Sequence, residues 1–293
     1  MATQTANTVF VTGATGTVGS SVVAGLLAKG SKVRALVHSE ESGAQALRDQ
    51  GVEVFIGEFT DDAVLDQAMA GVDRVFSLTP PNPDQVKQAN AITAAAQRSP
   101  AKPHVVRLSV MKSSTSAPSI VSAQHGEIDI VLRKSGLPVT FLKPNFFMQN
   151  TLLGAGTVGE QGVIYHAMGD GKLGMIDARD IADVAVEVLT TDGHEGKGYT
   201  LTGPESISFA QLAEQLSEVV GKEVQAVDVP VDAAEQSMVD MGLPEWVAGA
   251  LAEYSVRFSN NYADFFTDDV KNITGKSART YKELARDFAG AFA

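Results

Sequence analysis

The chain has 293 residues, of which 44% are hydrophobic and 20% are charged, as is typical of a globular protein with a substantial core. Its net charge of −12 argues against nucleic acid and against an anionic membrane surface as partners, because phosphate groups bind to basic faces. The sequence contains no cysteine, which excludes disulfides, thiolate nucleophiles, iron–sulfur clusters and cysteine zinc sites.

The start of the sequence has neither the basic region nor the apolar core of a signal peptide. No apolar run approaches the roughly 18 residues that a membrane-spanning helix needs. The five histidines lack metal-ligand spacing, and no Gly-x-Ser-x-Gly of a serine hydrolase occurs. We therefore expect a cytoplasmic protein that uses neither a metal nor a flavin.

Strand-like and helix-like runs alternate through the first half of the chain. Residues 8–12 form the first β-rich run, and residues 18–29 are apolar at helical spacing and end at a glycine. Further strands are predicted at 32–37, 52–56, 73–78, 104–109 and 139–142, and further helices at 42–50, 63–70, 85–97 and 122–134. Such repeats with short connections predict an α/β fold of the Rossmann type, a doubly wound parallel sheet with helices on both faces.

The alternation changes after about residue 150, where a glycine-rich stretch follows. The elements expected beyond it are short strands at 165–167 and 198–202 and helices at 180–190, with Asp180 as candidate cap, 208–220 and 246–257. We expect residues 1–150 to form the Rossmann domain and residues 151–293 a smaller substrate or lid lobe. Parts of 176–204 are expected to return to the first domain.

Three glycines, Gly13, Gly16 and Gly19, lie in the turn that follows the first strand and opens the first helix. In this setting one glycine permits the tight turn, one lets the backbone approach a pyrophosphate, and one lets the helix pack on the sheet. The amides at the helix N-terminus then stabilise the phosphates. The pattern predicts a nicotinamide dinucleotide in the N-terminal domain; the alternative is a tight turn without a ligand.

The end of the second strand bears on the choice of cofactor. An acidic residue there would bind the adenosine ribose hydroxyls and favour NAD, but His38 and Ser39 follow the strand and the first carboxylate is Glu40. Arg34 either adds positive charge at this site or lies under the helix layer. We predict that NADP(H) is preferred over NAD(H).

Together with the turn at 12–19, the stretches 77–81, 125–127, 136–147 and 199–204 resemble the atypical short-chain dehydrogenase/reductase superfamily. Within it the chain is most similar to NmrA-like proteins, which include triphenylmethane-dye and quinone reductases. This resemblance implies a set of cofactor contacts at the carboxyl ends of the strands. They are Gly13, Thr15, Gly16, Thr17, Val18 and Gly19 at the pyrophosphate, His38 and Ser39 at the adenosine ribose, Glu58 or Phe59 at the adenine, Thr79, Pro80 and Ser109 along the path to the nicotinamide, and Lys143, Pro144, Asn145 and Phe146 beside it.

Many members of the wider superfamily carry Tyr-x-x-x-Lys on the helix before the sixth strand, where the tyrosine donates a proton. In this sequence the lysine position falls on His125 and the tyrosine position on Val121. The usual proton donor is absent, so we expect acceptors that spread the incoming electron pair over a conjugated system: quinones, azo compounds, dyes, iminium ions or enones. His125 and Asn145 are the candidate catalytic residues, although His125 is alternatively a plain helix-surface histidine.

Other side chains leave alternatives open. Asp177 and Asp180 are interpreted as a helix cap with a local Arg179 pairing, and residues 146–148 either form the wall of an aromatic substrate site or pack in the core. We expect an NAD(P)H-dependent oxidoreductase with a small conjugated organic substrate, active as a monomer or homodimer. A non-catalytic NAD(P)-sensing regulator and an isomerase or epimerase are the competing functions.

Overall fold

The computed structural model describes residues 7–292 and divides them into two compact units. The first unit comprises the described residues up to Lys143 together with Ile181–Tyr199. The second comprises Pro144–Asp180 and the residues from Thr200 onward. Within residues 7–292, no helix is long and apolar enough to cross a membrane.

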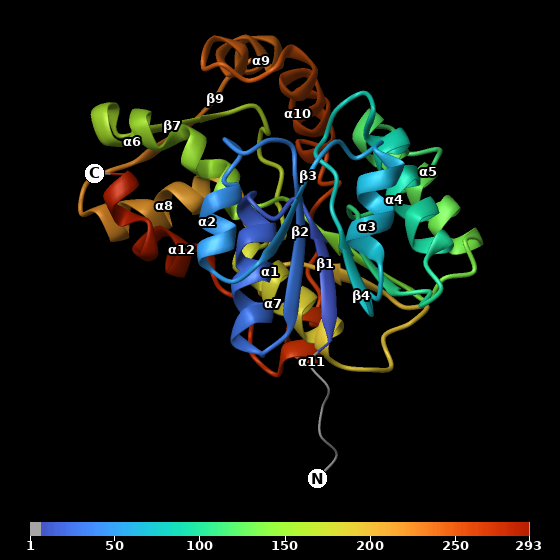
Figure 1. Ribbon diagram of the computed structural model, residues 1–293. Coiled ribbons are helices and arrows are strands. Elements are labelled where there is room, and N and C mark those ends of the chain that lie inside the picture. Colours follow the sequence, from blue (N-terminus) through green and yellow to red (C-terminus); the bar gives the residue numbers. More distant parts are fainter. Residues whose placement is uncertain (1–6, 293) are drawn as a thin grey trace. The chain divides into compact units, whose positions relative to one another are not determined.

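A seven-stranded sheet forms the centre of the first unit (Figure 1). The strand order is β3-β2-β1-β4-β5-β6-β8, and the pairs from β3 to β6 are parallel. The strands are β1 (Thr8–Thr12), β2 (Lys32–Val37), β3 (Glu53–Ile56), β4 (Arg74–Ser77), β5 (His104–Leu108), β6 (Val139–Pro144) and β8 (Gly198–Leu201). This confirms the predicted Rossmann-type parallel sheet.

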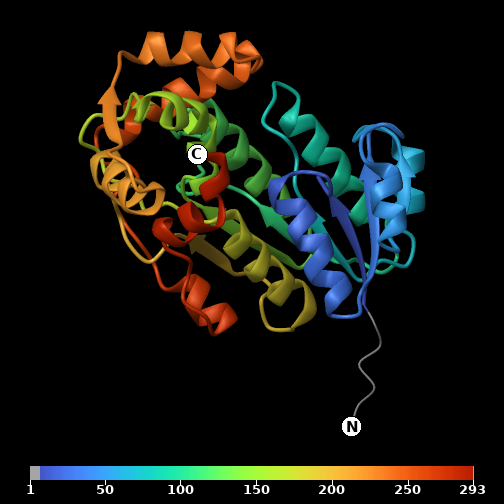
Figure 2. The same cartoon turned by 90° about the vertical axis from the view of Figure 1, so that its left-hand side faces the viewer.

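Helices cover both faces of this sheet (Figures 1 and 2). On one face α3, α4 and α5 pack side by side; on the other, α1 approaches α7 so closely that a Cβ on Gly25 would lie 2.7 Å from Val186. The helices are α1 (Thr17–Ala28), α2 (Ala44–Asp49), α3 (Asp62–Met69), α4 (Gln85–Arg98), α5 (Ile120–Lys134) and α7 (Ala178–Thr190). The central strands are therefore covered on both faces, which is why β1 and β5 are nearly continuous buried runs.

The strand order reverses between β1 and β4, which lie next to each other in the sheet. In open α/β sheets the crevice at the carboxyl ends of such neighbouring strands is where ligands bind. The glycine-rich turn follows β1 and therefore lies at this point.

The second unit contains a small parallel sheet in which Val163–His166 pairs with Gln225–Asp228. Its elements are η1 (Met148–Gly154), α6 (Ala155–Gln161), β7 (Val163–His166), α8 (Phe209–Val220), β9 (Gln225–Asp228), α9 (Val231–Asp240), α10 (Glu245–Phe258), α11 (Asp269–Thr274), α12 (Tyr281–Asp287) and η2 (Ala289–Ala291). The sequence pattern did not predict α6, β9, α9, α11 or α12. A strand of four residues such as β9, a helix without a fully buried side chain such as α9, and helices of six or seven residues carry little hydrophobic periodicity.

Two helices, α5 and α7, begin two residues before their predicted starts because their caps lie further upstream. α5 begins at Ile120 rather than at 122, since the Ser119 side chain accepts a hydrogen bond from the Ser122 amide. α7 begins at Ala178, and Asp177 rather than Asp180 accepts the Arg179 amide at 2.8 Å. The expectation that Asp180 caps this helix was therefore wrong.

Candidate functional site

Two glycines of the turn between β1 and α1 are required by the fold itself. Gly13 has a φ of +71°, in the left-handed region, and a Cβ there would lie 2.6 Å from Leu78 Cδ2. A Cβ on Gly19 would lie 1.9 Å from the carbonyl oxygen of Gly13, so that only glycine lets α1 pack this close to the turn. Local packing explains both positions without any ligand.

Gly16 differs from these two glycines. Its backbone is extended, with φ −85° and ψ 175°, and a Cβ there would meet only the Gly13 carbonyl oxygen at 3.4 Å. Among residues 7–292 nothing therefore requires a glycine at this position. A bare backbone that faces open space is what a pyrophosphate needs in order to approach the chain closely.

The N-terminus of α1 has features that favour an anion. Gly16 is its N-cap, so no side-chain oxygen caps the helix, and the first turn holds no acidic residue. The helix dipole and the first amides favour a phosphate there. Thr12 holds the turn in place, since its Oγ1 donates to the Leu78 carbonyl at 2.7 Å and accepts from the Leu78 amide at 2.9 Å. Sequence reasoning missed Thr12 because Leu78 lies 66 residues away.

At the end of β2, the side chain of His38 is 71% exposed and its Nδ1 lies 2.7 Å from Glu58 Oε1. The two residues predicted at the adenosine end are thus brought together. Ser39 Oγ lies 3.1 Å from Ser42 Oγ. A 2′-phosphate at this site would meet one histidine and one carboxylate side by side.

Arg34 takes no part in this group. Its Nε donates to Glu53 at 2.7 Å, and its guanidinium also donates to the carbonyl oxygens of Ala68 and Ala70. The second of the two interpretations, in which Arg34 lies under the helix layer, is the one that the structure adopts.

Beyond β5 and β6, a buried carboxylate organises the predicted contacts. Asp129 on α5 accepts hydrogen bonds on Oδ2 from Ser109 at 3.0 Å and Ser113 at 2.7 Å, and the ammonium of Lys143 lies 3.1 Å away. The structure therefore brings Ser109 and Lys143 together. Sequence reasoning missed Asp129 and Ser113; the signal was the spacing of Asp129 four residues after His125, on the same face of a helix.

His125 is buried at 8% exposure, so the interpretation as a surface histidine was wrong. Its Nδ1 lies 3.4 Å from the guanidinium of Arg107, which is fully buried on β5, and its Nε2 lies 3.4 Å from Gln85 Nε2. Burial, followed by the charges of Arg107 and Lys143, holds the pKa of His125 well below its ordinary value. The imidazole is therefore neutral.

We expect the protein to lose stability as the pH falls from about 7 to about 5. Burial and the neighbouring Arg74 lower the pKa of His104 to about 4, and burial lowers the pKa of His166 as well as that of His125. The unfolded chain takes up these protons near pH 6.5 (about the ordinary histidine value), but the folded chain does so only at lower pH, so acid favours unfolding.

For His104 the stability is complete above about pH 6.5 and is lost towards about pH 4, with a full effect of about 3 kcal/mol. Urea unfolding of the parent chain and of His104→Asn, at about pH 7 and at about pH 5, measures this loss of unfolding free energy. The variant should show the smaller loss, and equal losses would contradict the assignment.

In the second unit, the Asn145 side chain bonds to backbone at both ends. Its Nδ2 donates to the Ala263 carbonyl at 3.1 Å and its Oδ1 accepts from the Phe146 amide at 2.7 Å. Asp177 bonds to the Arg179 guanidinium at 2.6 Å, in the local pairing that the sequence predicts. Asp180 instead binds the side chain and the amide of Arg279. Neither aspartate is a free carboxylate.

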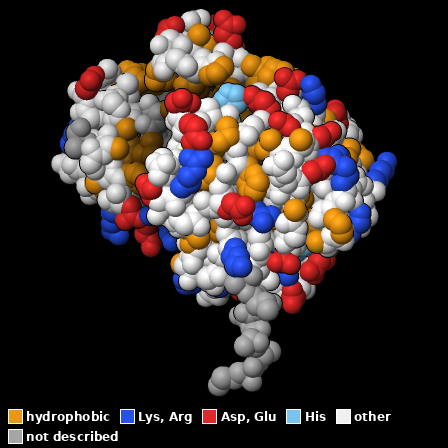
Figure 3. Space-filling view, viewed as in Figure 1, with side chains coloured by type: hydrophobic (Ala, Val, Ile, Leu, Met, Phe, Trp, Pro, Cys, Tyr) orange, Lys and Arg blue, Asp and Glu red, His pale blue; other side chains and the backbone are white. Residues whose placement is uncertain are grey.

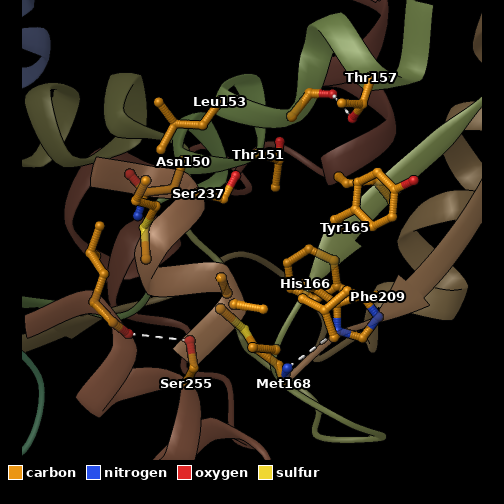
Figure 4. Close-up of a pocket in the computed structure, with 18 of the residues that line it drawn as sticks. Asn150, Thr151, Leu153, Thr157, Tyr165, His166, Met168, Phe209, Ser237 and Ser255 are labelled. Atoms are coloured by element: carbon orange, nitrogen blue, oxygen red, sulfur yellow. Dashed lines mark hydrogen bonds between the residues drawn. The ribbon is translucent and has the colours of Figure 1, made fainter. Parts of the chain in front are cut away.

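A cavity of about 350 Å³ lies within the second unit and opens to its surface. Figure 4 shows side chains from η1, β7, α8, α9 and α10 around it. The described residues that line it include no aspartate, glutamate, lysine or arginine. They are Phe146, Asn150, Thr151, Leu153, Gly154, Thr157, Ile164, Tyr165, His166, Ala167, Met168, Phe209, Val229, Ala233, Ala234, Ser237, Met238, Met241, Leu251 and Ser255.

Aromatic and sulfur side chains give this cavity its character. The ring of His166 stacks on Phe209 at 4.5 Å, and its Nδ1 accepts the Met168 amide at 3.3 Å, which suits a neutral ring. The exposed apolar side chains Leu153, Tyr165 and Met241 all line the cavity. Hydrophobic surface is also visible over α9 and α10 in Figure 3. Large exposed apolar side chains around a cavity mark a binding site for an apolar ligand.

The predicted aromatic wall is divided between two roles. Phe146 lines the cavity and packs edge-on against Phe258 at 5.7 Å, whereas Met148 is 2% exposed and belongs to the core. Core packing is therefore right for Met148, whereas the role of Phe146 as the wall of a substrate site stays a prediction.

The chain is similar to known reductases over nearly its whole length. The NAD(P)H azoreductase of Xenophilus azovorans is 38% identical over 284 residues, which cover 97% of this chain and 99% of that protein. A (4-alkanoyl-5-oxo-2,5-dihydrofuran-3-yl)methyl phosphate reductase of Streptomyces griseus is 37% identical and covers 97% and 99% of the two chains. Among solved structures, an NADPH-dependent quinone oxidoreductase of Escherichia coli in complex with NADPH superposes with a TM-score of 0.87 at 27% identity, over 96% of this chain and 99% of that one.

The sequence model of the NmrA-like family matches residues 5–288. Most of the residues that suggested this resemblance lie on strands and turns, and residues 125–127 lie within α5. This match and the full-length relatives confirm the resemblance, and the chain belongs to the NmrA-like family.

Proposed function

We propose that this chain is an NAD(P)H-dependent reductase that transfers hydride to a conjugated electrophile. The observation that carries the proposal is the bare, uncapped N-terminus of α1 at Gly16, which fits a pyrophosphate and which the packing of the chain does not otherwise require. The similar proteins are named as reductases of azo compounds, of a dihydrofuranone and of quinones, all of which have conjugated acceptor groups.

The bound dinucleotide would supply the hydride, and the chain would hold it at the carboxyl ends of the strands. We propose that the turn at residues 13–19 binds the pyrophosphate, and that the predicted residues after β2, β3, β4 and β5 line the rest of the path. These contacts, and those of Pro144, Asn145 and Phe146, stay predictions.

α5 offers no acid for an ordinary ketone reduction. Val121, at the position of the superfamily tyrosine, is buried and apolar, and His125 is neutral. A saturated ketone would require a proton on its alkoxide as it forms, whereas a quinone or azo group delocalises the two electrons and takes its proton from water afterwards. Binding, orientation and exclusion of water are then the main tasks of the chain.

The uncharged cavity of the second unit suits the apolar part of such an acceptor. Its volume lies within the range of ligand pockets, about 300–1,000 Å³. Aromatic walls stack on planar substrates, and methionine side chains adapt to differently shaped ones. We propose a small, planar organic molecule as the substrate.

Steady-state consumption of NADPH with a panel of acceptors tests the function. Quinones, azo dyes and enones should raise consumption above the enzyme-free rate, and a saturated cyclic ketone should not. If no acceptor raises it although the cofactor binds, the chain is a dinucleotide sensor rather than a reductase. Preference for the saturated ketone would overturn the assigned acceptor class.

We propose NADP(H) as the preferred cofactor, because β2 ends without a carboxylate. Because the Glu58 carboxylate lies beside His38, a substitution at either residue should change this preference. Glu58→Gln should raise the affinity for NADPH relative to NADH by about two- to fivefold, as for an exposed charge pair, and His38→Asp should shift it toward NADH.

Fluorescence titration with both cofactors measures this ratio. Glu53→Gln is the matched control, since it removes an exposed carboxylate of β3 that bonds to Arg34 instead. A ratio that stays at the parent value in both variants would show that the ribose binds elsewhere.

A further inference from the structure

The wall of the cavity in the second unit is mostly apolar. Its polar side chains are those of Asn150, Thr151, Thr157, Tyr165, His166, Ser237 and Ser255. Three of their hydroxyls donate to backbone carbonyls, at 2.8 Å for Thr151 and for Thr157 and at 3.2 Å for Ser255. The hydroxyl of Tyr165 donates to Gln161 at 3.2 Å. The chain therefore already uses the protons of these four hydroxyls.

The side-chain amide of Asn150 differs from these hydroxyls, because it has no hydrogen-bond partner among residues 7–292. Asn150 lies on η1, is half-buried and lines the cavity (Figure 4). Neither atom of the amide is enclosed by the chain. The amide offers two donor hydrogens and one acceptor oxygen, all of them available to a molecule in the cavity.

The backbone that carries Asn150 is held on both sides. Gln149 Nε2 donates to Asp177 Oδ1 at 2.8 Å. Thr151 Oγ1 lies 3.0 Å from the hydroxyl of Tyr281, and both residues are buried. A polar side chain on a backbone that is already fixed binds a ligand at a low entropic cost.

Two other side-chain atoms of the described lining have no partner, Ser237 Oγ and His166 Nε2. Ser237 is exposed, so water competes with a ligand for its hydroxyl. The ring of His166 is stacked on Phe209 at 4.5 Å, and the ring has one unpartnered polar atom. Asn150 therefore offers the larger capacity for hydrogen bonds with a ligand.

We propose that Asn150 determines which acceptors the cavity takes, because its amide donates to the carbonyl oxygen of a bound quinone or enone. This inference rests on the proposed function and names the substrate class of the same cavity. A hydrogen bond in apolar surroundings is stronger than one in water, and an amide left unpaired against an apolar ligand loses its hydration without compensation. Acceptors that carry a carbonyl oxygen are thus preferred over similar molecules without one.

The same hydrogen bond favours the reduction. Reduction of the acceptor adds two electrons and one hydrogen from NADPH, which becomes NADP⁺. Negative charge accumulates on the carbonyl oxygens of the acceptor, and a proton from water then neutralises it. A hydrogen bond to a charged oxygen is about twice as strong as one to a neutral oxygen. The amide of Asn150 therefore stabilises the reduced form more than it stabilises the acceptor.

Binding of 1,4-naphthoquinone and of naphthalene to the full chain, with NADP⁺ present, tests the contact without turnover. The two ligands share their ring system, and the chain has no thiol to which the quinone could add. Asn150→Leu keeps a similar volume but has no polar group. It should raise the ratio of the dissociation constants, naphthoquinone over naphthalene, about tenfold, as for one lost hydrogen bond. Asn150→Asp has the same shape but no donor and should also raise this ratio.

Asn260→Leu is the matched control, because Asn260 is exposed, bonds to the Val256 carbonyl and does not line the cavity. It should leave the ratio at the parent value. The infrared carbonyl band of bound naphthoquinone provides a second readout, and should lie at a lower wavenumber in the parent complex than in that of Asn150→Leu.

Three results would overturn the inference: no binding of naphthoquinone to the parent chain, a ratio unchanged in both Asn150 variants, or a ratio that rises in His166→Phe instead. These measurements use no NADPH and observe no turnover. A chain that binds naphthoquinone through Asn150 but reduces no acceptor would contradict the reductase function and leave the carbonyl contact standing.

Discussion

Gly16→Val is expected to leave the chain folded and to remove its affinity for NADPH and NADH. A Cβ at this position meets only one atom of the described chain, at 3.4 Å, so the substitution fits the turn. The valine methyl groups would instead occupy the space in which a pyrophosphate contacts the α1 amides. The loss of two charge-assisted hydrogen bonds, about 1.5–3 kcal/mol each, weakens binding by at least about 100-fold.

Two comparisons separate the loss of binding from a loss of folding. Gly156→Val on α6 adds the same side chain where a Cβ meets no atom within 4 Å, and should keep both fold and binding. Gly19→Ala sets a Cβ 1.9 Å from the Gly13 carbonyl oxygen and should lower the melting temperature. If Gly16→Val binds NADPH as tightly as the parent chain does in calorimetry, the dinucleotide site is misplaced.

A carboxylate in the apolar cavity should reduce turnover without affecting cofactor binding. Met238 lies on α9, is half-buried and lines the cavity. Met238→Asp would force an uncharged acceptor to desolvate a carboxylate in order to bind, which lowers kcat/KM for a quinone by about 10- to 100-fold. The dissociation constant for NADPH should stay unchanged.

Val239→Asp is the matched control for this prediction. Val239 is the next residue of α9 and is also half-buried, but it does not line the cavity. Its substitution brings the same charge to the same helix and should leave kcat/KM near that of the parent. Equal effects of the two variants would indicate that α9 is merely disturbed and that the cavity does not receive the substrate.

Local sequence patterns were sufficient to predict most of the strands and helices of the first unit. The alternation of strands and helices and the glycine spacing depend on residues a few positions apart, and so they predicted the parallel sheet and the turn after β1. The helix starts at Ile120 and Ala178 were missed by two residues because Ser119 and Asp177 cap them from further upstream.

The contacts within the candidate site could not be predicted in this way, because they join residues that are distant in the sequence. Arg34 was left with two interpretations, and only its bonds to Glu53 and to the end of α3 distinguish them. The burial of His125 was likewise invisible, since the side chains that enclose it come from α4, β5 and β6.

The amino-acid sequence was thus enough to infer dinucleotide binding, the missing tyrosine and the family. Each of these inferences depends on residues that are adjacent or regularly spaced along the chain. The protonation state of His125, the engagement of Asp129 and the apolar cavity arise only when distant segments meet. Burial and electrostatic fields depend on what surrounds a group in space, and spacing along the chain does not report those surroundings.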